Sequence, residues 1–174
     1  MVSLSFLFWL LVILFGVVGA MRGWAKEILV IFSVILALFV ITVLETYVPY
    51  VSGAINSASP AAHFWVRAIV VIGMAFFGYQ SPNFPPLEAK TRGERIQDRL
   101  LGFLLGMVNG YLIFGTLWWY MNSANYPFEQ ITPPRGDDFN ALALLNNMAP
   151  AKLVAPGIYI AVAVAFVFVL IVFI

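Results

Sequence analysis

Apolar residues fill five long stretches of this chain, and polar residues are concentrated in the segments between them. The stretches cover residues 2–21, 28–44, 62–79, 100–121 and 153–174. Because a helix needs about 20 mainly apolar residues to cross the hydrocarbon core of a bilayer, each stretch predicts a membrane-spanning helix. The pattern therefore predicts an all-α integral membrane protein with a four-helix transmembrane body and a fifth, C-terminal transmembrane helix, in one polytopic domain of residues 1–174.

The fifth stretch differs from the others because no polar residue follows Tyr159. A helix that is apolar all round must be covered by lipid or by another subunit, so we expect this span to bind a partner. A re-entrant segment is the alternative. It would move the C-terminus and leave the four-helix body unchanged.

A short helix is predicted between the fourth and fifth stretches, over residues 138–148. Asp137 or Asp138 can cap its N-terminus, and Pro150 follows its end. Its expected apolar stripe consists of Phe139, Leu142, Leu145 and Met148. Such a helix is expected to lie flat in the membrane interface, packed on the bundle.

Lysine and arginine are distributed unevenly among the connecting segments. Six lie in segments 22–27 and 80–99, and two lie in segments 45–61 and 122–152. Cytoplasmic segments of membrane proteins are enriched in basic residues. The distribution predicts a multi-pass membrane protein with the N-terminus outside and the C-terminus in the cytoplasm.

Glycine recurs at regular intervals in two of the predicted helices. Gly102, Gly106 and Gly110 are spaced by four residues, and a second set consists of Gly16, Gly19 and Gly23. Small residues on one face let a second helix backbone approach closely. We expect these faces to form helix contacts, either within the chain or through self-association.

The sequence contains little that points to catalysis. It has no cysteine, one histidine and a net charge of +1, and hydrolase, zinc-protease and phosphate-loop motifs are missing. We therefore predict no enzyme activity, no catalytic or metal-binding residues and no nucleic-acid partner. No cofactor is predicted, although contacts with lipid, quinone or pigment are compatible with the chain.

Two ionisable residues in or near the third stretch need an explanation. Arg67 lies one turn inside it and can extend toward the outer surface to pair with Glu45, or contact an ion or substrate. His63 lies at its outer boundary. It is either a solvated residue or a weak candidate ligand for chlorophyll or haem.

Two motifs give the chain a family resemblance. Residues 22–27 read Arg-Gly-Trp-Ala-Lys-Glu, and residues 98–110 begin with Asp98 and Arg99 and continue through Gly102, Gly106 and Gly110. In this order and spacing they resemble the colicin V production protein (CvpA) family over residues 1–150. The chain departs from the family at Asn109, where a basic residue is frequent, and the fifth stretch lies outside the resemblance.

The resemblance implies a small inner-membrane protein linked to toxin export, envelope maintenance and stress tolerance, with no agreed biochemical activity. The motif residues have a physical interpretation as well. Arg22 and Lys26 can anchor a tight turn that Gly23 allows, while Glu27 can pair with Lys26, Arg22 or Arg99. We interpret the motif as a clamp between two cytoplasmic loops.

Three functional hypotheses follow. The first is a non-enzymatic membrane protein of this family, with a structural or assembly role in the envelope, which acts through helix contacts with a membrane-protein partner, with lipid or with itself. The alternative is an accessory transmembrane subunit of a respiratory or photosynthetic complex. The third, a small transporter component, is disfavoured because no charged or broken-helix site lies at the predicted midplane.

Overall fold

The computed structural model describes residues 3–80, 95–134 and 138–173. Within these ranges the chain forms only helices, and their order is α1 (Leu4–Arg22), α2 (Trp24–Tyr47), α3 (Pro49–Asn56), α4 (Pro60–Tyr79), α6 (Arg95–Ser123), α7 (Phe139–Asn147), α8 (Ala149–Lys152) and α9 (Gly157–Phe173). By length and composition, α1, α2, α4 and α6 can each cross a membrane, and α9 is a shorter apolar helix. The predicted fold class is confirmed.

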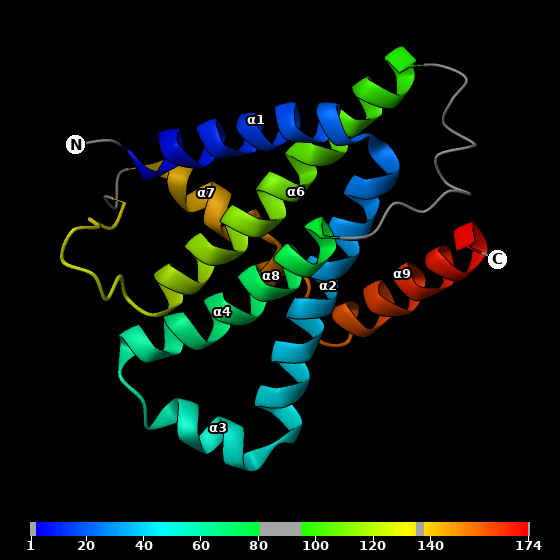
Figure 1. Ribbon diagram of the computed structural model, residues 1–174. Coiled ribbons are helices and arrows are strands. Elements are labelled where there is room, and N and C mark those ends of the chain that lie inside the picture. The colour runs from blue at the N-terminus through cyan, green and yellow to red at the C-terminus, as the bar shows by residue number, and fades with distance from the viewer. Residues whose placement is uncertain (1–2, 81–94, 135–137, 174) are drawn as a thin grey trace.

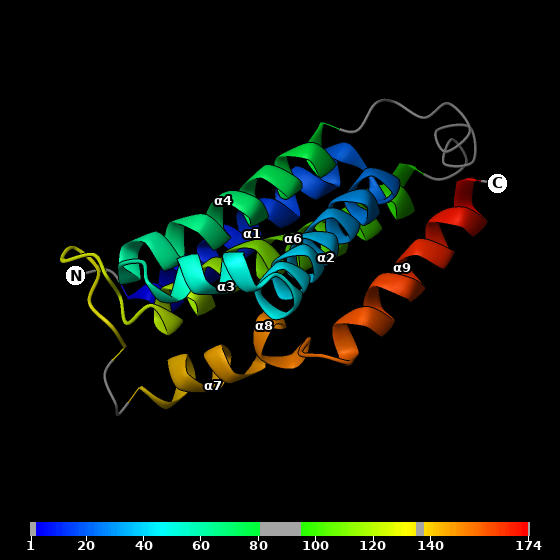
Figure 2. The same ribbon diagram turned by 90° about the horizontal axis from the view of Figure 1, so that it is seen from below.

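The four long helices form one bundle with α6 at its centre. Helix α6 contacts α1, α2 and α4, and α2 also packs along α4 (Figure 1). Figure 2 shows α7, α8 and α9 in a row along one side of this body. Helix α1 begins and α9 ends at opposite ends of the bundle in both views.

Apolar side chains fill the bundle and also cover its surface. One of its buried clusters consists of Val30, Val34, Ala75 and Ile113. Outside it, large apolar residues remain exposed, among them Ile69 (64%) and Phe77 (77%). A surface of this kind is compatible with lipid around the bundle rather than water.

Several helices extend beyond the apolar stretches that predicted them. Helix α2 begins at Trp24, and α4 begins at Pro60, where the Ser59 hydroxyl accepts a hydrogen bond from the Ala62 N–H at 3.3 Å. Counting apolar residues finds the part of a helix that lies in lipid, whereas capping decides where the helix begins. The same count missed α3, which starts with Pro49 in its first turn.

Helix α7 forms within the range predicted for the short helix, but it buries a different face from the predicted one. The Asp138 carboxylate caps it by accepting a hydrogen bond from the Ala141 N–H at 3.1 Å. Phe139 is 79% exposed, whereas Ala141 and Leu145 are buried. The predicted stripe is therefore wrong at Phe139 and Leu142, because the small Ala141 side chain lets α7 approach the cluster around Phe8 and Trp118.

A hydrogen bond between two aromatic residues stabilises the turn that follows α6. Asn125 and Tyr126 have positive φ angles of 54° and 50°. The Trp118 indole N–H donates a hydrogen bond to the Tyr126 hydroxyl at 3.0 Å. Burial raises the pKa of Tyr126, which favours the neutral hydroxyl.

Helix α9 begins at Gly157, four residues later than the predicted stretch. The residue before a proline avoids helical geometry, so Ala155 and Pro156 lie ahead of the helix. Only its first turn enters the core, where Ile158 is fully buried. The 17 residues of α9 extend about 26 Å at 1.5 Å per residue, slightly less than the roughly 30 Å hydrocarbon core of a bilayer.

Candidate functional site

The motif residues meet where α1 turns into α2. A single residue, Gly23, joins the two helices with φ +86°, a conformation that favours glycine. The Asp98 carboxylate of α6 lies against this turn and accepts a hydrogen bond from the Trp24 N–H at 3.2 Å. A Cβ atom on Gly23 would lie 2.9 Å from both carboxylate oxygens, so the turn requires glycine for space as well.

Glu27 lies at the centre of this region and is fully buried. Its Oε1 accepts a hydrogen bond from Arg22 Nη1 at 2.7 Å, and its Oε2 accepts one from Asn109 Nδ2 at 2.7 Å. The same amide nitrogen also donates to the Glu27 backbone oxygen at 2.9 Å. A buried carboxylate is tolerated when it is paired and hydrogen-bonded, and both conditions are met here.

Arg22 connects the cluster to a third part of the chain. Its Nη2 donates to the backbone oxygen of Tyr79 at the end of α4, at 2.9 Å. Its guanidinium carbon lies 4.4 Å from the centre of the Tyr79 ring, which gives a cation–π contact. We call Arg22, Glu27, Tyr79, Asp98 and Asn109 the polar clamp, because these five residues connect α1, α2, α4 and α6.

The structure brings together most of the predicted motif residues. Arg22, Gly23, Glu27 and Asp98 are in the clamp or in contact with it, and Lys26 lies half-buried in the same turn of α2. Arg99 is exposed and lies outside the clamp, so the partner of Glu27 is Arg22 rather than Arg99.

Sequence reasoning did not assign a role to Asn109 or to Tyr79. The sequence could have indicated a buried hydrogen-bonding role for Asn109, since an amide in the middle of an apolar helix must find partners inside the protein.

The regularly spaced glycines form a seam between α1 and α6. A Cβ atom on Gly19 would meet the Gly102 oxygen and lie 2.8 Å from the Gly106 Cα, and one on Gly110 would lie 2.9 Å from the Val12 Cα. The two backbones are thus nearly in contact. This glycine face is used within the chain, where it brings Asp98 and Asn109 up to the α1–α2 turn.

A second ion pair lies near the opposite end of the bundle. Arg67 donates from Nε to Glu45 Oε1 at 2.7 Å and from Nη2 to Glu45 Oε2 at 3.1 Å. Its guanidinium also lies 5.4 Å from the centre of the Tyr120 ring. The pairing with Glu45 was predicted from the sequence and is present in the structure.

His63 lies in the first turns of α4, on the same side of that helix as Arg67. Among the described residues, no three His, Asp or Glu side chains come close enough to hold a metal ion. Within the polar clamp, the Arg22 guanidinium is paired with the Glu27 carboxylate, and the Asp98 carboxylate accepts a hydrogen bond from the Trp24 N–H.

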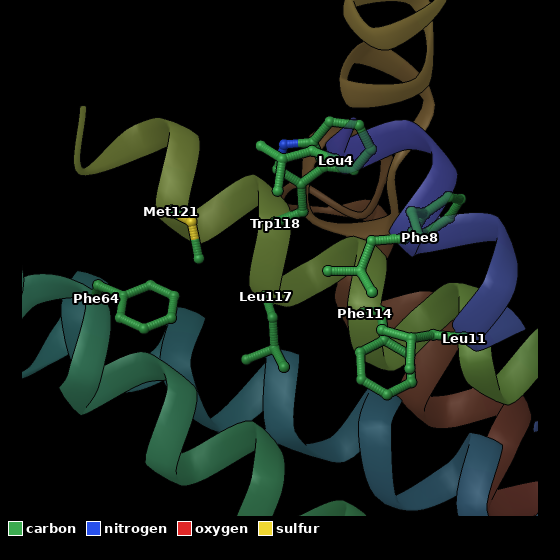
Figure 3. A pocket seen from close by; sticks show the side chains of 9 residues that line it. Leu4, Phe8, Leu11, Phe64, Phe114, Leu117, Trp118 and Met121 are labelled. Carbon is green, nitrogen blue, oxygen red and sulfur yellow. The ribbon is translucent and has the colours of Figure 1, made fainter. Parts of the chain in front are cut away.

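An apolar pocket of about 200 Å³ lies between α1, α4 and α6. Figure 3 shows Phe64 of α4 facing Leu117 and Met121 of α6, with Phe8 and Leu11 of α1 on the other side. All the residues that line it are apolar. It can take hydrocarbon. The Trp118 indole N–H is the one hydrogen-bond donor among the side chains that line it, and this group is already bonded to the Tyr126 hydroxyl rather than available to orient a quinone or pigment headgroup.

Four helices that are long and apolar enough to cross a membrane define the class of this chain as a multi-pass helical membrane protein. The profile of the colicin V production protein family matches residues 4–133, which includes α1 to α6 and both motifs. The chain therefore belongs to this family. Helices α7, α8 and α9 lie beyond the match, and neither curated proteins nor solved structures gave a match to the chain.

Proposed function

We propose that this chain is a non-enzymatic protein of the bacterial inner membrane with a structural or assembly role in the envelope, acting through contacts between helices. The observation that supports the proposal is that the four-helix body and helix α9 differ in how much of their surface is used within the chain. The four-helix body uses its buried charges and its glycines internally. Helix α9, in contrast, is attached to this body mainly through α2 and leaves most of its surface uncovered.

The surface of α9 supports a contact with a partner helix. Ile158, Ala161 and Ala165 form the side that faces the body, whereas Ile160 (62%), Val164 (64%) and Ile171 (74%) are exposed. An apolar helix in lipid gains specificity only through packing, since lipid tails are as apolar as its side chains. A partner that packs against the exposed side of α9 would add contacts without disturbing the polar clamp.

Shortening the chain after Ile160 is expected to leave a folded, inserted body that has lost its associations. Ile158 is retained in this variant, so the core stays filled. Removing all residues after Lys152 also removes Leu153 and Ile158, and loss of one fully buried isoleucine alone costs about 2–5 kcal/mol. Thermal unfolding in detergent compares the two variants, and native mass analysis detects lost partners. Aggregation of the longer variant would show that α9 belongs to the body.

The orientation that we propose places the N-terminus outside and the segment before α6 in the cytoplasm. Ser57 and Gln97 are exposed near opposite ends of the bundle, and the chain has no cysteine of its own. We expect an impermeant thiol reagent to label Ser57→Cys in intact cells and Gln97→Cys only after lysis. The reverse pattern would invert the orientation.

Gentle extraction followed by native mass analysis separates the proposed role from its alternative. A monomer or homodimer favours the structural role in the envelope. A stoichiometric complex with respiratory or photosynthetic subunits would instead favour the accessory-subunit hypothesis, for which the same exposed α9 surface is the supporting observation.

A further inference from the structure

A large cavity lies at the end of the bundle where α2 and α6 end and α4 begins. Its volume is about 440 Å³, within the range of roughly 300–1,000 Å³ usual for small-molecule sites. Helix α8 and the segment that follows it form one wall through Pro150, Leu153 and Val154. Helices α2, α4 and α6 form the others, so the cavity lies between the four-helix body and the C-terminal part of the chain.

The polar part of the cavity contains an ion pair and an imidazole. Glu45 and Arg67 both line it, and their side chains are 28% and 18% exposed. His63 lies one turn before Arg67 on α4, and its Nε2 is buried without a hydrogen-bond partner among the described residues. The hydroxyls of Thr42 and Ser123 donate to backbone oxygens of their own helices. Trp119 and Tyr120 of α6 also line the cavity, with an indole N–H and a phenolic hydroxyl. The ion pair supplies the charges of the cavity, and His63 lies beside it.

The inner part of the same cavity is apolar. Along α2, Glu45 is followed inward by Ile41 and Leu38 on the same side of the helix. From Glu45 to Leu38 the cavity follows roughly 10 Å of helix, at 1.5 Å per residue. Leu153 and Val154 line the wall on the α8 side. A ligand that fits has a charged end and a hydrocarbon end.

We propose that this cavity binds a phospholipid whose headgroup carries both a phosphate and a primary amine. The Glu45 carboxylate accepts hydrogen bonds from the ammonium group, and the phosphate oxygens accept hydrogen bonds from Arg67 and His63. The two bonds to Glu45 use two of the five N–H donors of the guanidinium, so the pair can persist beside the bound phosphate. The first carbons of the acyl chains pack against Ile41 and Leu38.

Charge complementarity selects a zwitterion over an anion. Glu45 and Arg67 carry opposite unit charges, so together they contribute no net charge to the cavity. An anionic headgroup would face the Glu45 carboxylate without a cation to offer it, whereas a zwitterion matches both members of the pair. A choline headgroup fits less well, because its quaternary ammonium has no N–H to donate.

Lipid titration of the purified full-length chain tests this assignment. Native mass analysis measures binding of phosphatidylethanolamine, phosphatidylcholine and phosphatidylglycerol with identical acyl chains. We expect the first to bind about tenfold more tightly than either of the others, the effect of one charge-assisted hydrogen bond. Equal binding of all three, or preference for phosphatidylglycerol, would overturn the proposal.

Single substitutions test which residues cause the preference for the ethanolamine lipid. In Glu45→Gln the ratio between ethanolamine and choline lipids should fall to about one, and in His63→Ala both should weaken by roughly three- to tenfold with the ratio unchanged. Glu129→Gln, an exposed carboxylate outside the cavity, is the matched control and should bind as the parent does. If Glu45→Gln does not fold, the double variant Glu45→Gln/Arg67→Gln removes both charges together and should also abolish the preference. A preference that survives these changes contradicts the site.

A water-soluble analogue tests whether the headgroup binds without its acyl chains. Glycerophosphoethanolamine has the same phosphate and amine but no acyl chains. We expect it to compete poorly even at a hundredfold excess, because it cannot fill the apolar part of the cavity. Competition at equal concentration would mean that a water-soluble phosphoamine occupies the cavity and that the lipid assignment is wrong.

Discussion

Replacing Gly106 with alanine is expected to destabilise the folded protein, although the change adds a single methyl group. That methyl group would meet the backbone oxygen of Phe15 and lie 2.9 Å from the Gly19 Cα. Backbone atoms cannot rotate away as a side chain can, so α1 and α6 must separate. Overpacking of this kind costs about 1–3 kcal/mol, and the midpoint of thermal unfolding in detergent should fall accordingly.

Two other glycines provide matched controls for this prediction. A Cβ atom on Gly73 of α4 would have no atom within 4 Å, and one on Gly115 of α6 would first meet the flexible Met148 side chain at 3.4 Å. Alanine at either position should leave stability the same or slightly higher, since alanine favours helix more than glycine does. If Gly106→Ala and Gly73→Ala unfold at the same temperature, the two helices do not depend on close backbone contact.

The glycine spacing illustrates what sequence can predict about this fold. Glycines four residues apart in Gly102, Gly106 and Gly110 define a helix face that accepts a second backbone, whatever that backbone is. Spacing within one helix contains no information about the partner, so a second copy of the chain was an open alternative. In the structure this face packs against α1, where Gly19 lies against Gly102 and Gly106.

The polar clamp contains contacts that cannot be predicted from the sequence. Arg22 and Glu27 are unusual residue types at the edge of an apolar segment, so they attract attention in the sequence. Arg22, however, also binds the backbone oxygen of Tyr79, a group that every residue has. Only the position of α4 selects this oxygen. In the same way, the buried side of α7 depends on where the body offers space for Ala141, and the pattern of α7 alone favoured Phe139 and Leu142.

Loss of the Arg22 charge is expected to have the largest effect of any single change in the clamp. In Arg22→Met, the Glu27 carboxylate remains fully buried and loses the cation bound to Oε1 at 2.7 Å. Breaking a buried ion pair by removing one partner costs about 3–5 kcal/mol, because the remaining charge is left without compensation. Unfolding measured by denaturant titration in detergent should show this loss.

The double variant Arg22→Met/Glu27→Met tests whether the cost comes from the unpaired charge. It removes both charges and keeps an apolar side chain of similar size at each position, and Asn109 can still donate to the backbone oxygen of residue 27. We therefore expect it to be more stable than Arg22→Met alone, since replacing both members of a buried pair is often close to neutral. Arg99→Met, at an exposed position on α6, is the control and should change stability by less than about 0.5 kcal/mol. If the effects of Arg22→Met and Glu27→Met simply add, the two residues contribute independently and the clamp does not act as a unit.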